Sequence, residues 1–372
     1  MEFINLKKQY QVLKPVIDER IQNIMAKASF IGGSEVDEFE KKFAEYIGRK
    51  HCISCGNGTD ALLLSCLVYG VGKDDAVFCP DMTFIASIEP ACMLGAAPVF
   101  VDIEPETYNL SPECLEKEIK RVIEEGTLNP KAVIMVDFLG NPANVEAIEH
   151  ICKKYGLILI EDAAQAIGAF YKDKKCGSIG DISCTSFFPS KPLGCYGDGG
   201  AILTDDDNIA DLLRSYKMHG KGSSKYDNVR IGINSRLDTI QAAVLLAKLE
   251  ILDKEIQERQ RIAKRYDYAF ADIFQIPFVK EGCRCSYAQY VLLAKDKEHR
   301  AKVLEVMKKT DIPSLLYYPK EMHRMDAFHM DNNEEFPNAA RYANCNFGIP
   351  FSPYLTEEEQ DMVIHTIKSI YK

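Results

Sequence analysis

Seven short apolar runs alternate with amphipathic stretches between residues 51 and 205, and this alternation limits the possible folds more than any other feature. Each run suits one buried strand, and the stretches between the runs suit helices. This pattern favours a mainly parallel sheet with helices on both faces. We therefore expect an α/β fold with a mainly parallel seven-stranded sheet. The predicted strands are residues 51–55, 76–79, 98–102, 132–136, 157–161, 182–187 and 200–204.

The C-terminal third of the chain has a different periodicity. Residues 239–271 space their apolar side chains as a helix does and contain neither glycine nor proline, which predicts one long helix. Because 372 residues exceed one ordinary small domain, we expect this helix to join two domains. The large domain would cover residues 1–250, and a smaller C-terminal α/β domain would cover residues 251–372.

Composition excludes several classes of function. The 45 basic and 55 acidic residues give a net charge of −10, which argues against a nucleic-acid-binding surface. No apolar run reaches the roughly 20 residues that a membrane-spanning helix needs. Many of the 13 cysteines lie inside apolar runs, as buried thiols do in a reducing compartment. We therefore expect a cytoplasmic protein that binds neither nucleic acid nor membrane.

One segment holds the groups that a pyridoxal cofactor needs, namely a carboxylate for the ring nitrogen, a lysine for the aldehyde and donors for the phosphate. Asp162 follows the predicted strand 157–161, and Lys191 lies 29 positions further on. A charge-assisted hydrogen bond from the ring nitrogen to Asp162 would contribute about 1.5–3 kcal/mol. The same aspartate could instead cap a helix, because Asp favours that position.

Lys191 lies between Pro189 and Pro192, in a rigid turn that suits neither a helix nor a strand interior. A single lysine is far more often a surface charge than a nucleophile. The assignment of Lys191 therefore depends on Asp162, Gln165 and Ser186 being present with it.

Five stretches together resemble the DegT/StrS-type (DegT/DnrJ/EryC/StrS) nucleotide-sugar aminotransferases. They are Gly-Thr-Asp-Ala-Leu at 58–62, Glu-Asp-Ala-Ala-Gln at 161–165, Ser-Phe-Phe-Pro-Ser-Lys at 186–191, Gly-Asp-Gly-Gly-Ala at 197–201 and Asn-Ser-Arg-Leu-Asp at 234–238. The resemblance extends over roughly residues 1–260. It implies a fold-type I, aspartate aminotransferase-like homodimer with shared active sites that uses pyridoxal 5'-phosphate and L-glutamate. The chain looks most like the UDP-2-acetamido-2-deoxy-3-oxo-glucuronate aminotransferases, which serve surface polysaccharide biosynthesis.

The resemblance also implies roles for residues around the cofactor. Gly58, Thr59 and Asp60 would bind its phosphate through amides at a helix N-terminus, where anions are favoured, aided by the Ser186 hydroxyl. The same residues could form only a capping turn. Phe84 would stack on the cofactor ring, although a phenylalanine is more often simply part of a core.

The remaining cofactor residues follow from the same resemblance. Lys191 would form the Schiff base with the cofactor and move the proton, which makes it the catalytic residue. Gln165 would face the hydroxyl side of the ring. Asn234 would reach the phosphate bound by the neighbouring subunit, so that a single subunit would have an incomplete site.

Arg236, Tyr317, Tyr318 and His219 are the substrate-binding residues that the resemblance implies. Relatives often have His-Tyr-Pro beside the sugar, whereas here a tyrosine, Tyr317, stands in the place of the histidine. Arg236 could instead form a surface ion pair with Asp238, which would contribute little. A histidine such as His219 is, taken alone, more typical of a structural hydrogen bond.

Alternative functions remain on the same fold. They are amination at C4 of a 4-keto-6-deoxy sugar, dehydration of a sugar by the same cofactor, and a non-catalytic regulatory role. Dehydratases replace the Schiff-base lysine with histidine, so Lys191 disfavours them. The presence of Asp162 and Gln165 beside Lys191 disfavours a regulator.

No metal site is expected. Cys52 and Cys55 have the spacing of a metal motif, but a strand puts residues three apart on opposite faces. His323 and His329 are expected in a polar loop that has no pattern of carboxylates.

Overall fold

The seven predicted runs form one sheet in the computed structural model, which describes residues 1–224, 226–328 and 335–371. The strand order is β1-β9-β8-β5-β4-β2-β3. Only β9 runs antiparallel to its neighbours, so the prediction of a mainly parallel seven-stranded sheet is confirmed. The strands are β1 (His51–Cys55), β2 (Asp75–Pro80), β3 (Ala97–Val101), β4 (Asn129–Val136), β5 (Ile158–Asp162), β8 (Ile182–Ser186) and β9 (Gly200–Thr204).

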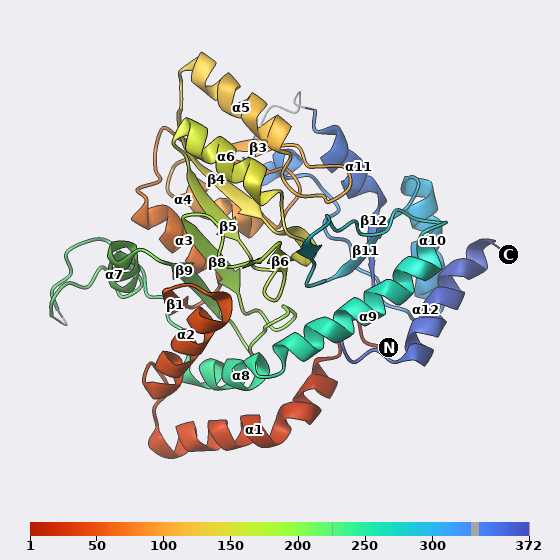
Figure 1. Ribbon diagram of the computed structural model, residues 1–372, viewed down its shortest axis with the longest axis horizontal. Helices are drawn as coiled ribbons and strands as arrows, with labels where there is room; N and C mark the ends of the chain where they lie inside the picture. Colours follow the sequence, from red (N-terminus) through yellow and green to blue (C-terminus); the bar gives the residue numbers. More distant parts are fainter. Residues whose placement is uncertain (225, 329–334, 372) are drawn as a thin grey trace.

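Helices cover both faces of this sheet (Figure 1). Successive side chains of a strand point to opposite faces, so Val77 and Phe78 of β2 belong to two separate cores. The core that contains Phe78 is covered by α2 (Ser34–Ile47), α5 (Pro112–Glu125), α6 (Val145–Tyr155) and α8 (Thr239–Leu249). The core that contains Val77 is covered by α3 (Gly58–Val68), α4 (Glu89–Met93) and α7 (Asp207–Tyr216).

A third core is formed only by buried residues between 262 and 367, which agrees with a smaller C-terminal α/β unit. Its sheet has two antiparallel strands, β11 (Tyr290–Leu293) and β12 (Asn346–Ile349). We keep the domain boundary between residues 250 and 251 as a proposal. The helices of this part are α9 (Leu252–Phe270), α10 (Lys297–Lys309), α11 (Pro337–Cys345) and α12 (Glu357–Lys368).

The prediction of one long helix over residues 239–271 is wrong, because the segment forms two helices, α8 and α9, that meet at an angle (Figure 1). Leu245 of α8 packs in a core of the large sheet, whereas Ile262 of α9 packs in the C-terminal core. The chain therefore turns between them to reach two separate cores. Because neither glycine nor proline marks the break, local periodicity could not reveal it.

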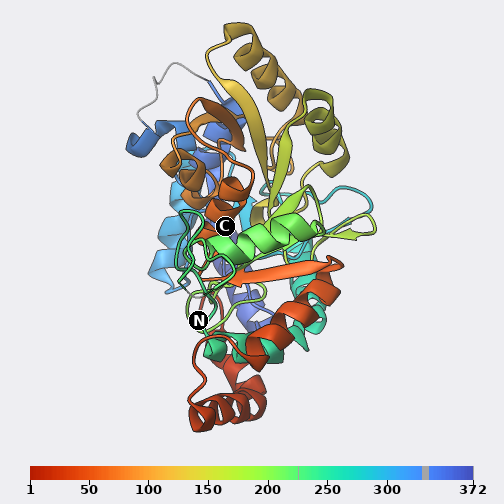
Figure 2. The same cartoon turned by 90° about the vertical axis from the view of Figure 1, so that its left-hand side faces the viewer.

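The remaining elements lie outside the main sheet. α1 (Leu6–Lys27) packs against α8, and a small three-stranded sheet joins β6 (Phe170–Tyr171), β7 (Lys174–Lys175) and β10 (Cys283–Arg284). The loop between α7 and α8 projects beyond α7, and Figure 2 views the protein from that side. Among the described residues, none of the helices combines the length and apolar character that crossing a bilayer requires.

Candidate active site

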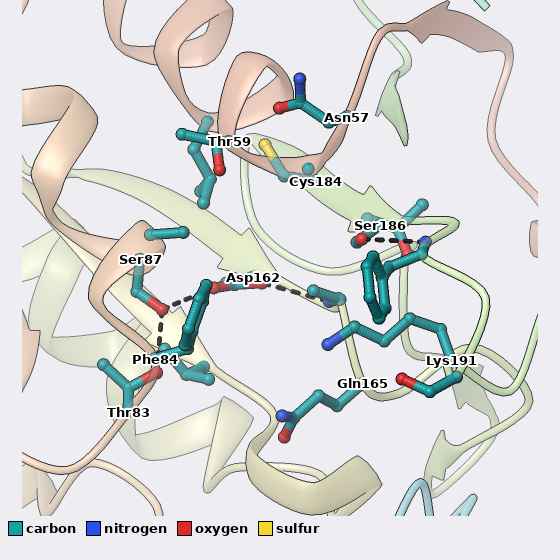
Figure 3. Close-up of a pocket in the computed structure, with 18 of the residues that line it drawn as sticks. Asn57, Thr59, Thr83, Phe84, Ser87, Asp162, Gln165, Cys184, Ser186 and Lys191 are labelled. Carbon is teal, nitrogen blue, oxygen red and sulfur yellow. Dashed lines mark hydrogen bonds between the residues drawn. The ribbon is translucent and has the colours of Figure 1, made fainter. Parts of the chain in front are cut away.

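A cavity of about 660 Å³ lies where the carboxyl ends of β4, β5 and β8 meet the N-terminus of α3 and the loop after β2. This is the place that a parallel sheet predicts for a ligand. Ten of the thirteen residues predicted from the sequence line it (Figure 3). They are Gly58, Thr59, Asp60, Phe84, Asp162, Gln165, Ser186, Lys191, Tyr317 and Tyr318.

Asp162 is the buried carboxylate of this cavity, at the end of β5. Its Oδ2 accepts a hydrogen bond from the Ser87 hydroxyl at 2.7 Å, and its Oδ1 accepts one from the Ala164 amide at 3.1 Å. Burial raises the pKa of Asp162, while both hydrogen bonds and the charge of Lys191 oppose that rise. The Ala164 hydrogen bond belongs to a turn and no helix begins after Asp162, so the helix-cap alternative is wrong.

Lys191 enters the cavity from the loop after β8, and its amine points into the space between Asp162 and Gln165 (Figure 3). The loop is a closed turn, because the Lys191 amide donates to the Phe188 carbonyl at 2.9 Å. Burial lowers the pKa of the Lys191 amine, and the charge of Asp162 opposes this change. The site thus holds a buried amine and a buried carboxylate in one cavity, as a pyridoxal ring requires.

The N-terminus of α3 forms a third part of the wall. Asn57 caps this helix, because its Oδ1 accepts a hydrogen bond from the Asp60 amide at 2.8 Å. The amides of Gly58 and Thr59 have no hydrogen-bond partner among the described residues. Those two amides are therefore free to bind an anion, whereas the Asp60 amide, which the resemblance also assigned to the phosphate, is already engaged.

Gly58 allows α3 to approach β8 closely. A Cβ atom at Gly58 would lie 2.8 Å from the Cβ atom of Ser186, which is closer than real side chains come. The absence of a side chain at Gly58 therefore brings the Ser186 hydroxyl beside the free helix amides. Asp60 has a different task, because its Oδ2 accepts a hydrogen bond from the Ser235 hydroxyl at 2.6 Å.

Gln165 and Phe84 form the opposite side of the cavity. The Gln165 Oε1 accepts a hydrogen bond from the Leu139 amide at 2.6 Å, and its Nε2 donates to the Tyr318 hydroxyl at 3.4 Å. The side-chain amide is thus oriented with its donor toward the cavity. Phe84 is 54% exposed and lies 5.8 Å from Tyr318 between ring centroids. The alternative that Phe84 is simply a core residue is therefore wrong.

Three predicted residues do not line the cavity of this single chain. Asn234 and His219 are exposed on the projecting loop, where His219 has a left-handed backbone with φ of 61°. Arg236 is half-buried and places its guanidinium 3.9 Å from the sulfur of Met218. Within the described part of the chain, Arg236 and Asp238 form no ion pair, so that alternative is not realised.

Sequence reasoning missed the hydroxyls that hold Asp162. Ser87 lies 75 positions before Asp162 in the chain, and Thr83 shares a hydrogen bond of 2.8 Å with Ser87. Serine and threonine are common in turns, so no local signal could distinguish these two. Gln289 and Phe188 also line the cavity and were not predicted as site residues.

One buried group in the described chain has the spacing of metal ligands, and it consists of Asp137, Glu161 and Cys176. Both Glu161 oxygens already accept hydrogen bonds, from the amides of Gly177 and Ile179 and from a serine hydroxyl. Burial, and then the charge of Glu161, raise the pKa of Asp137. We therefore interpret this group as a hydrogen-bonded carboxyl pair that supports β5 from the face opposite Asp162.

The expectation that His323 lies in a polar loop is wrong, because its side chain is buried against Asp81. The fold brings these residues together from distant parts of the chain, which a local pattern cannot indicate. His329 lies outside the described residues.

Comparisons with known proteins show the family of the chain. A model of the DegT/DnrJ/EryC1/StrS aminotransferase family matches residues 12–368. UDP-2-acetamido-2-deoxy-3-oxo-D-glucuronate aminotransferase of Pseudomonas aeruginosa is 42% identical, over 95% of this chain and 96% of its own. A pleiotropic regulatory protein of Geobacillus stearothermophilus is 37% identical, over 99% of this chain and 98% of its own.

Two solved structures are similar over nearly the whole chain. A DegT DnrJ EryC1 StrS aminotransferase from Brucella abortus has a TM-score of 0.97 and 44% identity, and the match covers 100% of this chain and 99% of that one. NtdA from Bacillus subtilis, solved with the bound cofactor PMP, has a TM-score of 0.87 and 25% identity. That match covers 96% of this chain and 82% of that one.

Proposed function

The chain belongs to the DegT/DnrJ/EryC1/StrS aminotransferase family, and we propose that it transfers an amino group from L-glutamate to a UDP-linked keto-sugar. The acceptor that we favour is a 3-keto N-acetylglucosamine uronate, on its way to an amino sugar for a surface polysaccharide. The observation that carries the proposal is the cavity in which Lys191 and Asp162 meet. The choice of sugar is supported by the 42% identical relative named for that substrate.

The residues of the cavity fit pyridoxal 5'-phosphate, the cofactor of this family of aminotransferases. Lys191 would hold its aldehyde, Asp162 its ring nitrogen, and the free amides of Gly58 and Thr59 its phosphate, together with the Ser186 hydroxyl. When bound, the cofactor supplies an electron sink for the carbon that loses its proton. The exposed ring of Phe84 would stack on the cofactor.

Asp162 would be the charged partner that keeps the ring nitrogen of the bound cofactor protonated. The hydrogen bonds from Ser87 and Ala164 favour the charged carboxylate against the cost of burial. Gln165 would present its amide donor to the ring hydroxyl, because its carbonyl oxygen already accepts the hydrogen bond from the Leu139 amide.

Lys191 moves the proton in both halves of the reaction. Burial lowers the pKa of its amine, which favours the neutral form that acts as a base. In the first half-reaction it removes the proton from Cα of glutamate. In the second it delivers a proton to the sugar carbon that receives the amino group. Because 2-oxoglutarate leaves before the keto-sugar binds, the kinetics would be ping-pong.

We expect Gly58→Ala to weaken cofactor binding about tenfold, equivalent to about 1.4 kcal/mol. The added methyl group would push Ser186 away from the helix amides that bind the phosphate. Titration of the apoenzyme with pyridoxal phosphate, followed by absorbance, measures the dissociation constant. Gly72→Ala is the matched control, because its new Cβ atom would lie 3.8 Å from its nearest neighbour, the Leu94 carbonyl. Equal affinities in the two variants would contradict the proposed phosphate site.

We also propose that the protein is a homodimer with shared active sites. Lys191 is the only cation among the described lining residues, which include three aspartates, Asp60, Asp162 and Asp198. The cofactor and the nucleotide both carry phosphates, so the cavity of one chain offers little positive charge to bind them. Asn234 and Arg236 lie on the projecting loop, from which we propose that they enter the site of a second copy. Ile231 on the same loop is 93% exposed, as an apolar side chain at an interface would be in one chain alone.

Shared sites predict that two inactive variants restore each other. Lys191→Ala and Asn234→Asp each inactivate both sites of their own homodimer. In a mixed dimer, one site combines the native Lys191 of one subunit with the native Asn234 of the other. After the two proteins are unfolded together and refolded at equal amounts, about a quarter of the sites should be active. Turnover of the mixture measures this fraction. A mixture as inactive as its components would contradict shared sites.

The acceptor is identified by running the reaction in reverse. The enzyme is incubated with 2-oxoglutarate and a panel of amino-sugar nucleotides, and glutamate is measured. We expect the most glutamate from the UDP-linked 3-amino uronate. A preference for a 4-amino-6-deoxy sugar would replace the proposed acceptor, and glutamate formation from none of them would support a regulatory role.

We also propose a cytoplasmic location, which is supported by thirteen free cysteines.

A further inference from the structure

Asp81 and His323 form a buried pair between positions 242 apart in the chain. The His323 Nδ1 and the Asp81 Oδ2 are 2.7 Å apart, and the His323 amide donates to the Asp81 Oδ1 at 2.8 Å. The neighbouring Met322 amide donates to the Asp81 carbonyl at 2.9 Å. Both side chains are almost fully buried, at 1% and 0% exposure. A buried pair with three hydrogen bonds is a firm attachment between its two segments.

The two attached segments are neighbouring parts of the cavity wall. Asp81 begins the loop that carries Phe84 and Ser87, and His323 follows Tyr317 and Tyr318 in the chain. The walls meet where Phe84 lies 5.8 Å from Tyr318 between ring centroids.

The tyrosine segment is fixed at a second point in the C-terminal unit. The Tyr317 amide donates to the Asn346 Oδ1 at 2.9 Å, and the Asn346 Nδ2 donates to the Tyr318 carbonyl at 2.9 Å. Asn346 therefore attaches the tyrosines to β12, and His323 attaches the same segment to the loop after β2. With only one attachment, the segment could move relative to Phe84.

The parts of the site that act on the amino donor are held in other ways. Asp162 is held by Ser87 and Ala164, Gln165 by Leu139, and the Lys191 turn by its own backbone bond to Phe188. None of these hydrogen bonds involves His323. Glutamate is small, whereas a nucleotide sugar has to contact much more of a 660 Å³ cavity.

Resting on the proposed function, we propose that the Asp81–His323 pair positions Tyr317 and Tyr318 for the nucleotide-sugar acceptor. His323 is thus a positioning residue whose effect falls mainly on the second half-reaction. The tyrosines touch the sugar nucleotide, and the pair acts only through them. A displacement of about 1 Å in such a wall can cost about 100-fold in rate.

The test separates the two half-reactions of the holoenzyme in His323→Leu. Rapid mixing with L-glutamate, followed by absorbance of the lysine-bound cofactor, gives the rate of the first half-reaction. Steady-state turnover gives KM and kcat/KM for the sugar nucleotide. We expect kcat/KM for the sugar to fall about 10- to 100-fold, mainly through KM, with the glutamate rate within about twofold of the native value.

His323→Asn is the matched control, because its amide nitrogen lies where Nδ1 does and can donate to Asp81. We expect it to recover most of the lost kcat/KM for the sugar. His323→Ser serves if the leucine variant fails to fold, because it removes the ring and leaves room for water beside Asp81. The glutamate rate and kcat/KM for the sugar nucleotide are then compared in the serine variant.

Three results would overturn the proposal. They are an unchanged sugar KM in a folded His323→Leu, an equal loss in both half-reactions, and failure of both ring-free variants to fold, which would make the pair a requirement for folding. Failure of the proposed function can be told apart from failure of this proposal, because it would appear in the native enzyme as a preference for another acceptor. The contrast between half-reactions is then measured with that acceptor.

Discussion

Replacement of Lys191 by alanine is expected to abolish transamination while the fold persists. The change removes the only amine in the described cavity wall, so no group remains to hold the cofactor aldehyde or to move the proton. We expect kcat to fall at least about 10⁴-fold, the upper end of what a positioned acid or base contributes. Turnover of glutamate with the keto-sugar measures the loss, and circular dichroism measures the fold.

The fold should survive because the turn around Lys191 does not depend on its side chain. The Lys191 amide bonds to Phe188, and the Cys195 amide bonds to the Phe187 carbonyl at 2.8 Å. Lys117→Ala is the control, since this lysine side chain is 81% exposed on α5. Measurable turnover by Lys191→Ala, after contaminating native enzyme is excluded, would show that another group is the base.

Asp162→Asn should have the second largest effect, a decrease in kcat of about 10- to 150-fold. Asparagine has the same shape and can still accept the Ala164 hydrogen bond, but it has no charge to keep the ring nitrogen protonated. The size follows from the loss of a charge-assisted hydrogen bond of about 1.5–3 kcal/mol. Single-turnover rates with saturating cofactor measure the effect on the chemical step.

Ser87→Ala is a milder variant for comparison with Asp162→Asn. It removes one hydrogen bond to Asp162 but leaves the charge in place, so kcat should fall only about fivefold, equivalent to about 1 kcal/mol. The order of the two effects tests the role of the charge. If Ser87→Ala were as damaging as Asp162→Asn, the loss would reflect the position of the side chain and not its charge.

The sequence could predict features that local patterns determine. Each of the seven buried strands is a local apolar run, and Asp162 and Lys191 lie in motifs that directly follow two of them. A parallel sheet gathers the ends of its strands at one edge, which explains why the predicted residues meet.

Contacts between distant segments could not be predicted in this way. Ser87 meets Asp162, and His323 meets Asp81, only after the whole chain has folded. The break between α8 and α9 has the same origin, because the two helices pack in different cores. His219, Asn234 and Arg236 lie outside the cavity of one chain, so their predicted roles rest on the homodimer that we propose.

The most direct test of the account is the absorbance spectrum of the purified holoenzyme. We expect an absorbance band at ~410–430 nm from cofactor bound to Lys191. L-glutamate should bleach it, and a UDP-linked 3-keto sugar should restore it. A spectrum that neither glutamate nor any amino-sugar nucleotide changes would contradict the assignment of this cavity to sugar transamination.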